Sequence, residues 1–328
     1  MTVSISGSLG VTFPDSSLQT GAASPYVTKN RLVNGSFAID QRNAGASQTF
    51  TAAAAVAYTV DRWYGSCTGA NITGQRVAGT SPNQYAYRFT GAASNTGTLF
   101  GQRIESFNTY DLISTTVTGS VTLKSSSITS VTWTAYYANS SDTFSSKTQI
   151  ATGTLTINST ATRYSFSFDA GANAGNGIAI EFTTGALTAT NTLQYENAQL
   201  EVGSTATPFE RRMYGNELAL CQRYYQKWAY EAGANKFVAG LGSAVISTEA
   251  DFCFPLGISM RAVPTASYVS LNIVDGAGGS FTPSSLTTYQ SSTSVLGMYL
   301  NTTGLTAYRP YFLRTNGSTG YLDASAEL

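Results

Sequence analysis

Tyrosine side chains are the residues of this sequence best suited to binding chemistry. A flat apolar ring can stack on the C–H face of a sugar while nearby Asn, Asp or Arg side chains bind the hydroxyl groups. Tyr289 lies in a long polar stretch, and Tyr299, Tyr308 and Tyr311 follow it. We therefore take these four residues as candidates for contact with a glycan. The alternative is packing, because aromatic residues favour β-strands in general.

The sequence contains no histidine, which limits its catalytic chemistry. Without an imidazole, the usual serine and cysteine triads, His-ligated zinc and imidazole acid–base catalysis are excluded. Two glycine-rich stretches, DGAGGS and DAGANAGNG, follow no strand-to-helix transition and are interpreted as turns, not as phosphate-binding loops. We expect no enzymatic activity, no catalytic residue and no cofactor.

Paired carboxylates could still support glycoside hydrolysis. The candidate acids are scattered without a motif that brings two together: Asp40, Asp61, Glu105, Glu181 and Glu196. Asp40 and Asp61 each lie near an arginine, in IDQR and VDRW, and we expect structural ion pairs there. No stretch resembles a calcium loop of regularly spaced acids, and metal binding stays open.

The charge balance argues against nucleic-acid and membrane partners. The 328 residues carry 18 basic and 18 acidic side chains, and charged residues make up only 11% of the chain. Neither a phosphate backbone nor an anionic membrane surface would attract such a chain. Abundant neutral polar residues and 20 tyrosines are typical of exposed β-sheet surfaces.

The cysteines and the N-terminus indicate no disulfide framework and no membrane insertion. Three cysteines without close spacing imply no paired scaffold. Cys221 and Cys253 are interpreted as small buried hydrophobes, and Cys67 is left undecided. The apolar run at 52–57 is too short to span a bilayer, and no basic region followed by an apolar stretch opens the chain.

The elements that must position these residues are mainly β-strands. From residue 30 to 212, short alternating runs are separated by Gly, Asn and Ser, which predicts a jelly-roll-like β-sandwich of seven or eight strands. In VTWTAYYA, Trp133 shares a face with Val131 and Ala135, so we expect it in the core. This sandwich type also hosts many carbohydrate-binding modules, which is an analogy of fold alone.

A single helix is predicted between two β-domains, within residues 213–229. Asn216 is a plausible N-cap, and Glu217 suits the positive end of the helix dipole. Four residues step by three, four and three, which is the spacing of a narrow seam between subunits: Leu218, Cys221, Tyr225 and Trp228. The alternative is that the same residues pack onto a sheet of their own chain, because so short a helix is not stable alone.

Residues 230–328 alternate again and predict a smaller C-terminal β-sandwich domain. Its longest stretch without apolar periodicity runs from Asp275 to Ser294 and is expected to be a functional or mobile loop. Residues 1–29 hold two short alternating runs that cannot form a core alone. They are interpreted as an attachment leader, with an unstructured terminus as the alternative.

Three pieces of the sequence resemble tail-fibre and related virion proteins of tailed bacteriophages. The segment QLEVGS, TPFERR and YGNELALCQRYY is similar to a junction near the C-terminus of many such proteins. NRLVNGSFAIDQRNAG with YTVDRWY resembles the opening of the sandwich that precedes this junction, and GVTFPDSSLQT resembles their short leader. Together these pieces extend over about two thirds of the chain.

The resemblance implies a homotrimeric virion appendage, assembled in the host cytoplasm. Residues 1–29 would then contact other tail or capsid proteins, and the C-terminal domain would bind a host cell-surface glycan. An alternative is a structural or decoration protein of the capsid or tail without receptor binding. A polysaccharide-degrading spike is disfavoured, because the sequence has no internal repeat of the β-helix kind.

Overall fold

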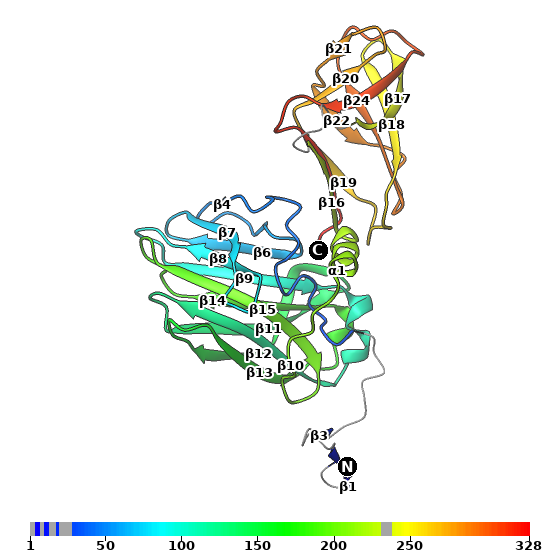
Figure 1. Ribbon diagram of the computed structural model, residues 1–328. Helices are drawn as coiled ribbons and strands as arrows, with labels where there is room; N and C mark the ends of the chain where they lie inside the picture. The colour runs from blue at the N-terminus through cyan, green and yellow to red at the C-terminus, as the bar shows by residue number, and fades with distance from the viewer. Residues whose placement is uncertain (1–3, 7–9, 13–17, 20–27, 231–237) are drawn as a thin grey trace.

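The computed structural model describes residues 4–6, 10–12, 18–19, 28–230 and 238–328. In these residues the chain is all-β with one short α-helix, as predicted: a two-sheet sandwich is joined to a smaller C-terminal β-region (Figure 1). Within the leader, three short strands pair antiparallel: β1 (Ser4–Ser6), β2 (Gly10–Thr12) and β3 (Leu18–Gln19). Attachment of the leader to a particle stays a prediction.

The sandwich consists of two antiparallel six-stranded sheets, which is more strands than the sequence pattern predicted. In spatial order, the first sheet contains β13 (Thr162–Asp169), β10 (Thr116–Ser125), β15 (Thr192–Val202), β8 (Tyr85–Thr90), β7 (Ile72–Ala78) and β4 (Gln48–Phe50). The second contains β12 (Thr143–Thr156), β11 (Ser130–Ser140), β14 (Ile178–Thr184), β9 (Gly97–Ile104), β6 (Trp63–Thr68) and β5 (Ala57–Tyr58). Three single-turn 3₁₀ helices accompany them: η1 (Ser106–Asn108), η2 (Tyr110–Leu112) and η3 (Ala174–Asn176).

Aromatic side chains from both sheets fill the sandwich core. Trp63 of β6 stacks on Phe100 of β9 with ring centroids 4.8 Å apart. Trp133 of β11 stacks on Phe166 of β13 at 4.2 Å and is 7% exposed, so its predicted place in the core is confirmed. The first contact lies within the second sheet, whereas the second joins a strand of each sheet, so aromatic packing helps to hold the two layers together.

The linking helix is shorter than predicted. Helix α1 runs from Tyr214 to Gln222, with Met213 and not Asn216 at the N-cap, while Glu217 does lie in its first turn. The next residues form strand β16 (Tyr225–Ala229), which pairs with β25 (Tyr321–Ser325). The aromatic residues after Gln222 favour a strand, and the partner strand satisfies their backbone groups.

Because the helix is shorter than predicted, the predicted seam between subunits cannot form as one helical face. Leu218 and Cys221 lie on α1, whereas Tyr225 and Trp228 lie on β16, so the four residues do not form one helical face. Cys221 and Tyr225 are buried within their own chain, and Trp228 packs against the C-terminal core. At Cys221, Tyr225 and Trp228 the structure therefore shows the alternative, which was packing within the chain, and Leu218 is half-buried. A homotrimer stays a prediction.

The C-terminal region has one hydrophobic core between two sheets. The smaller sheet has the order β16, β25 and β19 (Thr265–Val269). The larger has the order β21 (Ser280–Phe281), β20 (Leu271–Val274), β24 (Pro310–Thr315), β17 (Val238–Ile246), β18 (Glu249–Pro255), β23 (Val295–Asn301) and β22 (Ser285–Thr288). The stretch Asp275–Ser294 thus contains β21 and β22, and its prediction as one irregular loop was wrong.

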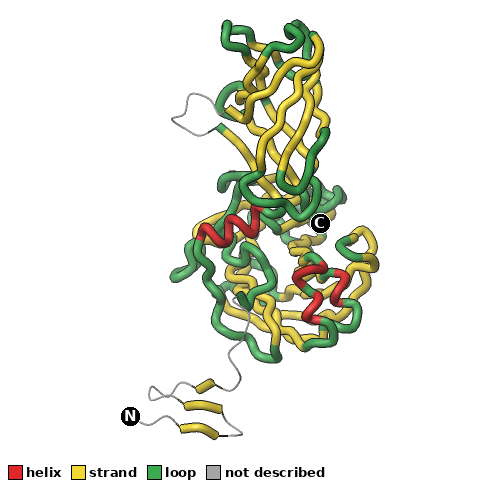
Figure 2. Tube along the Cα trace, turned by 90° about the vertical axis from the view of Figure 1, so that its right-hand side faces the viewer, coloured by secondary structure: helices red, strands yellow, loops and turns green. Residues whose placement is uncertain are grey.

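Charged side chains join the sandwich to the C-terminal region next to α1, which lies between the two bodies (Figure 2). The Arg62 side chain, 1% exposed, contacts the Glu327 carboxylate, and Arg42 Nη2 lies 2.9 Å from Glu327 Oε1. Arg223, just after α1, pairs with Glu105 of the sandwich at 3.0 Å. These contacts fix the C-terminal region against the sandwich.

Candidate functional site

The outer face of the larger C-terminal sheet holds a groove of about 480 Å³. Strands β17, β18, β23 and β24 and the residues after β22 line it. Its lining residues are Leu241, Gly242, Ser243, Asp251, Phe252, Cys253, Tyr289, Gln290, Gly297, Met298 and Pro310. Of the four tyrosines chosen from the sequence, only Tyr289 lines the groove directly.

Strand register explains why polar side chains reach this face. Ser243 pairs with Asp251, and Asp251 pairs with Tyr299. Paired residues point to the same face of a sheet, and their immediate neighbours point to the other. Phe252 and Met298 accordingly lie in the core. The sheet therefore presents one row of serine, aspartate and tyrosine on its outer face.

Two tyrosine rings pack together beside this row. The Tyr289 and Tyr299 ring centroids are 6.1 Å apart with an interplanar angle of 67°. Tyr289 remains 50% exposed, and Gln290 Nε2 donates to its hydroxyl at 3.1 Å. A Cβ at Gly297 would lie 2.3 Å from the Tyr289 carbonyl oxygen, so the glycine allows the Tyr289 backbone to approach β23. The ring pair is thus held in place by the strands beneath it.

Asp251 supplies an unused hydrogen-bond acceptor in the groove. Its Oδ1 atom is buried and has no hydrogen-bond partner. A buried acceptor without a donor costs roughly 1–3 kcal/mol, so a hydroxyl group entering the groove could relieve this penalty. The arrangement combines an exposed ring with a ready acceptor, which are the two features that sugar recognition uses.

The remaining two tyrosine candidates do not join the groove. Tyr311 is fully buried: its ring packs edge-on against Phe281 at 5.8 Å, and its hydroxyl accepts a hydrogen bond from Thr306 N at 3.0 Å. Its prediction as a receptor contact was wrong, because it points into the core. Tyr308 is 87% exposed, with φ of 62°, in the turn before β24. It stays a candidate only for a receptor contact separate from the glycan in the groove.

Cys253 also differs from its predicted environment. It is exposed on the groove floor, because it shares the outward face of β18 with Asp251. Cys67 and Cys221 are buried, and all three cysteines are free thiols.

The candidate acids of the sandwich are engaged by their own chain. Glu181 contacts Lys147 and accepts a hydrogen bond from the Tyr64 hydroxyl at 2.7 Å. Asp61 accepts from Gln41 N and Nε2, both at 2.7 Å, and does not pair with the adjacent Arg62. The other three acids are engaged as well. Asp40 accepts from Gly45 N at 2.7 Å and forms an ion pair with Arg76 at 3.8 Å, Glu105 pairs with Arg223 and Glu196 accepts from Asn83.

The described residues show neither a cluster of metal-ligating side chains nor a helix that could span a membrane. Within the described residues, no group of three or more Cys, Asp or Glu side chains gathers as a metal site. In the same residues, the helical segment lacks the length and the apolar character needed to cross a bilayer.

Comparisons with known proteins give distant structural likenesses. No family model matches the sequence, and no curated protein matches it. A Bacteroides thetaiotaomicron protein described as sugar binding has 12% identity and a TM-score of 0.38, with 53% of this chain and 100% of that chain covered. The module TmCBM61, solved with β-1,4-galactotriose, has 11% identity and a TM-score of 0.35, with 54% and 100% covered. The active domain of bacteriophage CBA120 tailspike protein 4 has 13% identity and a TM-score of 0.35, with 53% and 21% covered.

These likenesses are to carbohydrate-binding β-sandwiches and, in part, to one phage tailspike domain. Identities and scores this low carry no argument about what this chain binds. Its function has to be inferred from its own residues.

Proposed function

We propose that this chain is a non-enzymatic adhesion protein of a bacteriophage virion, of the tail-fibre type, whose C-terminal groove binds a glycan on the host surface. The observation that carries the proposal is the Tyr289 and Tyr299 ring pair beside the unpartnered Asp251 oxygen. A sugar ring would lie on the exposed tyrosine face, and one of its hydroxyl groups would donate to Asp251.

The charge of the groove favours a neutral glycan. Asp251 is the only charged side chain among the lining residues. A phosphorylated or sulfated ligand would be repelled by this carboxylate and would find no cation among the described residues that line the groove. Ser243 and Gln290 supply neutral polar groups at either side of the carboxylate.

The virion location and the homotrimer are supported by the resemblance of the junction and leader segments to tail-fibre proteins. In this proposal, residues 1–29 attach to the particle, and the chain assembles in the host cytoplasm. The free state of all three cysteines is compatible with a reducing compartment.

A second candidate function is a structural or decoration protein without receptor binding. Exposed apolar side chains on β17 and β24, of which Leu241 also lines the groove, favour it, because such patches often pack against another subunit. These residues are Leu241 at 60%, Ile246 at 51%, Val245 at 39% and Phe312 at 38% exposure. This alternative predicts no glycan affinity and many copies per particle.

A glycan array with the full-length chain tests the proposal. We expect the wild type to bind a defined set of neutral glycans and Tyr289→Ala to lose that binding. Tyr308→Ala is the matched control, because it removes an exposed ring outside the groove. Binding of no glycan by the wild type, or equal loss in both variants, would contradict a site at the groove.

A further inference from the structure

A second pocket lies in the sandwich body, between the start of β8, the middle of β15 and the segment that leads into α1. It has a volume of about 260 Å³. Its lining residues are Ser36, Ala38, Gln84, Tyr85, Asn197, Phe209, Glu210, Arg211, Arg212, Tyr214 and Glu217. One ordered water needs only ~10–15 Å³, so the pocket has room for more than a bridging water.

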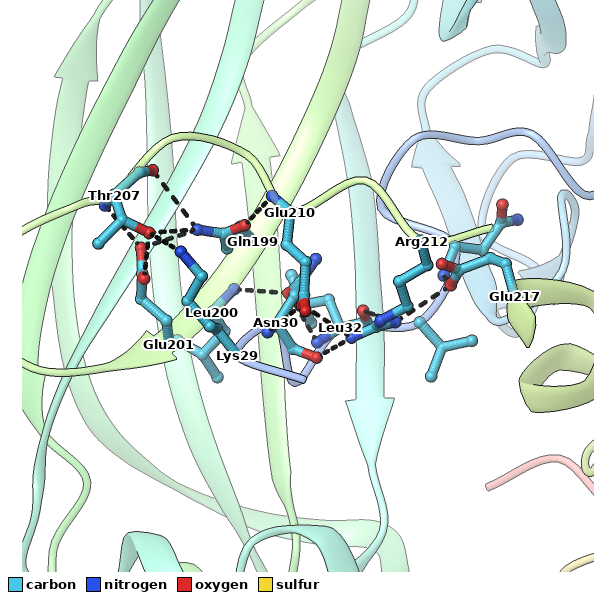
Figure 3. Close-up of polar contacts among 12 residues, drawn as sticks. Lys29, Asn30, Leu32, Gln199, Leu200, Glu201, Thr207, Glu210, Arg212 and Glu217 are labelled. Atoms are coloured by element: carbon cyan, nitrogen blue, oxygen red, sulfur yellow. Dashed lines mark hydrogen bonds and ion pairs between the residues drawn. The ribbon is translucent and has the colours of Figure 1, made fainter. Parts of the chain in front are cut away.

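The pocket wall is pre-formed. Glu210 N donates to Gln199 Oε1 at 2.8 Å, and Glu210 Oε2 accepts from Asn30 N at 2.8 Å (Figure 3). Arg212 bridges to Glu217 of α1 at 3.2 Å, as the same view shows. These contacts hold the segment before α1 against the sandwich, so a ligand would meet an ordered surface.

A β-bulge turns Asn197 towards this pocket. In the pairing of β10 with β15, Ser120 faces Gln199 and Thr122 faces Glu196, so one residue of β10 faces two of β15. Asn197 takes up the extra length with φ of 48°, a left-handed conformation that asparagine tolerates. Its side chain lines the pocket although the residue is only 7% exposed.

The orientation of the Asn197 amide follows from a chain of hydrogen bonds. The Glu196 carboxylate can only accept, so the Asn83 group 2.6 Å from it must be the Nδ2 donor. Asn83 Oδ1 then accepts from Asn197 Nδ2 at 2.6 Å and from Arg211 at 2.8 Å. This leaves Asn197 Oδ1 as a buried acceptor without a partner.

The other lining groups indicate a neutral ligand with a flat apolar face. Tyr85 of β8 supplies one aromatic ring, and Phe209 of the segment that leads into α1 and Tyr214 at the start of α1 supply two more. Two arginines and two glutamates line the pocket and balance in charge. Arg212 is already neutralised, since it lies 3.2 Å from Glu217 and 3.6 Å from Glu210. An anionic ligand would therefore gain little over a neutral one.

We propose that this pocket is a second binding site, for a single neutral sugar ring, in which a ligand hydroxyl donates to Asn197 Oδ1. The ring packs against Tyr85 and Phe209, and Arg211 donates to a further hydroxyl group. The volume lies just below the ~300–1,000 Å³ usual for ligand sites, which suits one ring better than an oligosaccharide. The pocket belongs to a different body from the C-terminal groove, and it stands independently of the function proposed above.

Saturation-transfer NMR on the full-length chain tests the site, with glucose, galactose and N-acetylglucosamine as probes. The parent protein carries Tyr289→Ala, so that the groove does not contribute. Probes at about 10 mM would occupy a site of 1 mM Kd almost fully. We expect at least one probe to bind, Tyr85→Ala to weaken it at least about tenfold and Tyr85→Phe to leave it within about twofold, because the ring is retained.

Asn197→Gly removes the acceptor while keeping a residue that adopts left-handed φ. It is also expected to weaken binding at least about tenfold. Absence of binding by the parent, or binding that both Asn197→Gly and Tyr85→Ala leave unchanged, would overturn the site. If thermal unfolding shows that Asn197→Gly does not fold, the Tyr85→Ala and Tyr85→Phe pair decides alone.

Discussion

Arg62 and Glu327 show how single charged residues hold the two bodies together. The Arg62 guanidinium lies over the Tyr224 ring at 3.4 Å and donates to the Arg103 carbonyl at 2.6 Å, in addition to its contact with Glu327. Replacing one partner of a buried ion pair leaves the other charge without compensation, which costs far more than the pair contributes. The pair is therefore sensitive to single substitutions.

We predict that Glu327→Gln lowers the free energy of unfolding by about 3 kcal/mol, because Arg62 stays buried without a counter-charge. Asp111→Asn is the control, since its pair with Arg31 leaves Asp111 32% exposed. There we expect a loss of at most about 1 kcal/mol. Denaturant unfolding of both variants measures the difference, and equal effects would contradict a dominant role for the buried pair.

Asp61 makes stability depend on pH in an unusual direction. Burial raises the pKa of its carboxyl from 3.8 to about 6, against the opposing hydrogen bonds from Gln41. The folded protein binds the carboxyl proton of Asp61 more tightly than the unfolded chain does. The protonated carboxyl therefore makes its full contribution to the free energy of unfolding below pH 3.8, and this contribution is lost as the pH rises through 6.

Relative to Asp61→Asn, the wild type should gain up to about 3 kcal/mol of stability between pH 7 and pH 4. The measurement is the unfolding free energy of both proteins across that range. Parallel pH profiles for the two would show that Asp61 is not the buried acid responsible.

At the scale of elements, alternation in the sequence was a good guide to strands and a poor one to the helix end. The all-β class and the core position of Trp133 could be predicted, because hydrophobic period and strand face are local properties. The helix was predicted to continue through Trp228. In the structure the residues from Tyr225 onward form β16, which pairs with β25 almost 100 positions away in sequence. A partner so distant leaves no local signal, so tertiary pairing overrode local propensity.

The same difference between local and long-range properties explains why some site residues could be predicted from the sequence and others could not. Alternation in EADFCFP could have placed Asp251 and Cys253 on the outer face, but Asp251 was missed and Cys253 was expected to be buried. Tyr311 was misjudged because proximity to the C-terminus says nothing about the face of a strand. The pocket at Asn197 depends on a bulge and on segments 36–38 and 209–217, which only the fold brings together.

A buried cysteine on α1 and an exposed cysteine on β18 allow the packing of α1 against its own chain to be tested. Cys221 is fully buried on α1, where burial raises the pKa of the thiol, and Cys253 is exposed on β18. We predict that Cys221→Ser lowers the free energy of unfolding by about 1–3 kcal/mol, because it buries a hydroxyl group. Cys253→Ser should change it by less than about 0.5 kcal/mol. Equal values from thermal or denaturant unfolding would contradict the assigned burial.

At the scale of the whole molecule, the chain is elongated, with the C-terminal region and the leader strands at opposite ends of the sandwich (Figure 1). Such an arrangement suits a protein that attaches by one end and binds by the other. The ion pairs near α1 set the direction of the C-terminal region relative to the sandwich.

The proposed homotrimer is tested by mass. Sedimentation of the full-length chain at micromolar concentration should give three copies of the 34.6-kDa chain. Since Cys221 and Tyr225 of the predicted seam are buried in their own chain, we expect the contacts between copies to involve other exposed apolar residues, such as Phe107 and Tyr110. A monomer under these conditions would contradict the trimeric appendage.

The groove beside Tyr289 is proposed to recognise a glycan through one aromatic ring and one carboxylate. The most direct test of this proposal is the affinity of the array-selected glycan, measured by titration calorimetry, for the wild type and for Asp251→Asn, Tyr289→Ala and Tyr308→Ala. We predict losses of about tenfold or more, roughly 1.4 kcal/mol, for the two groove variants and no loss for Tyr308→Ala. Unchanged affinity in both groove variants would contradict the proposal.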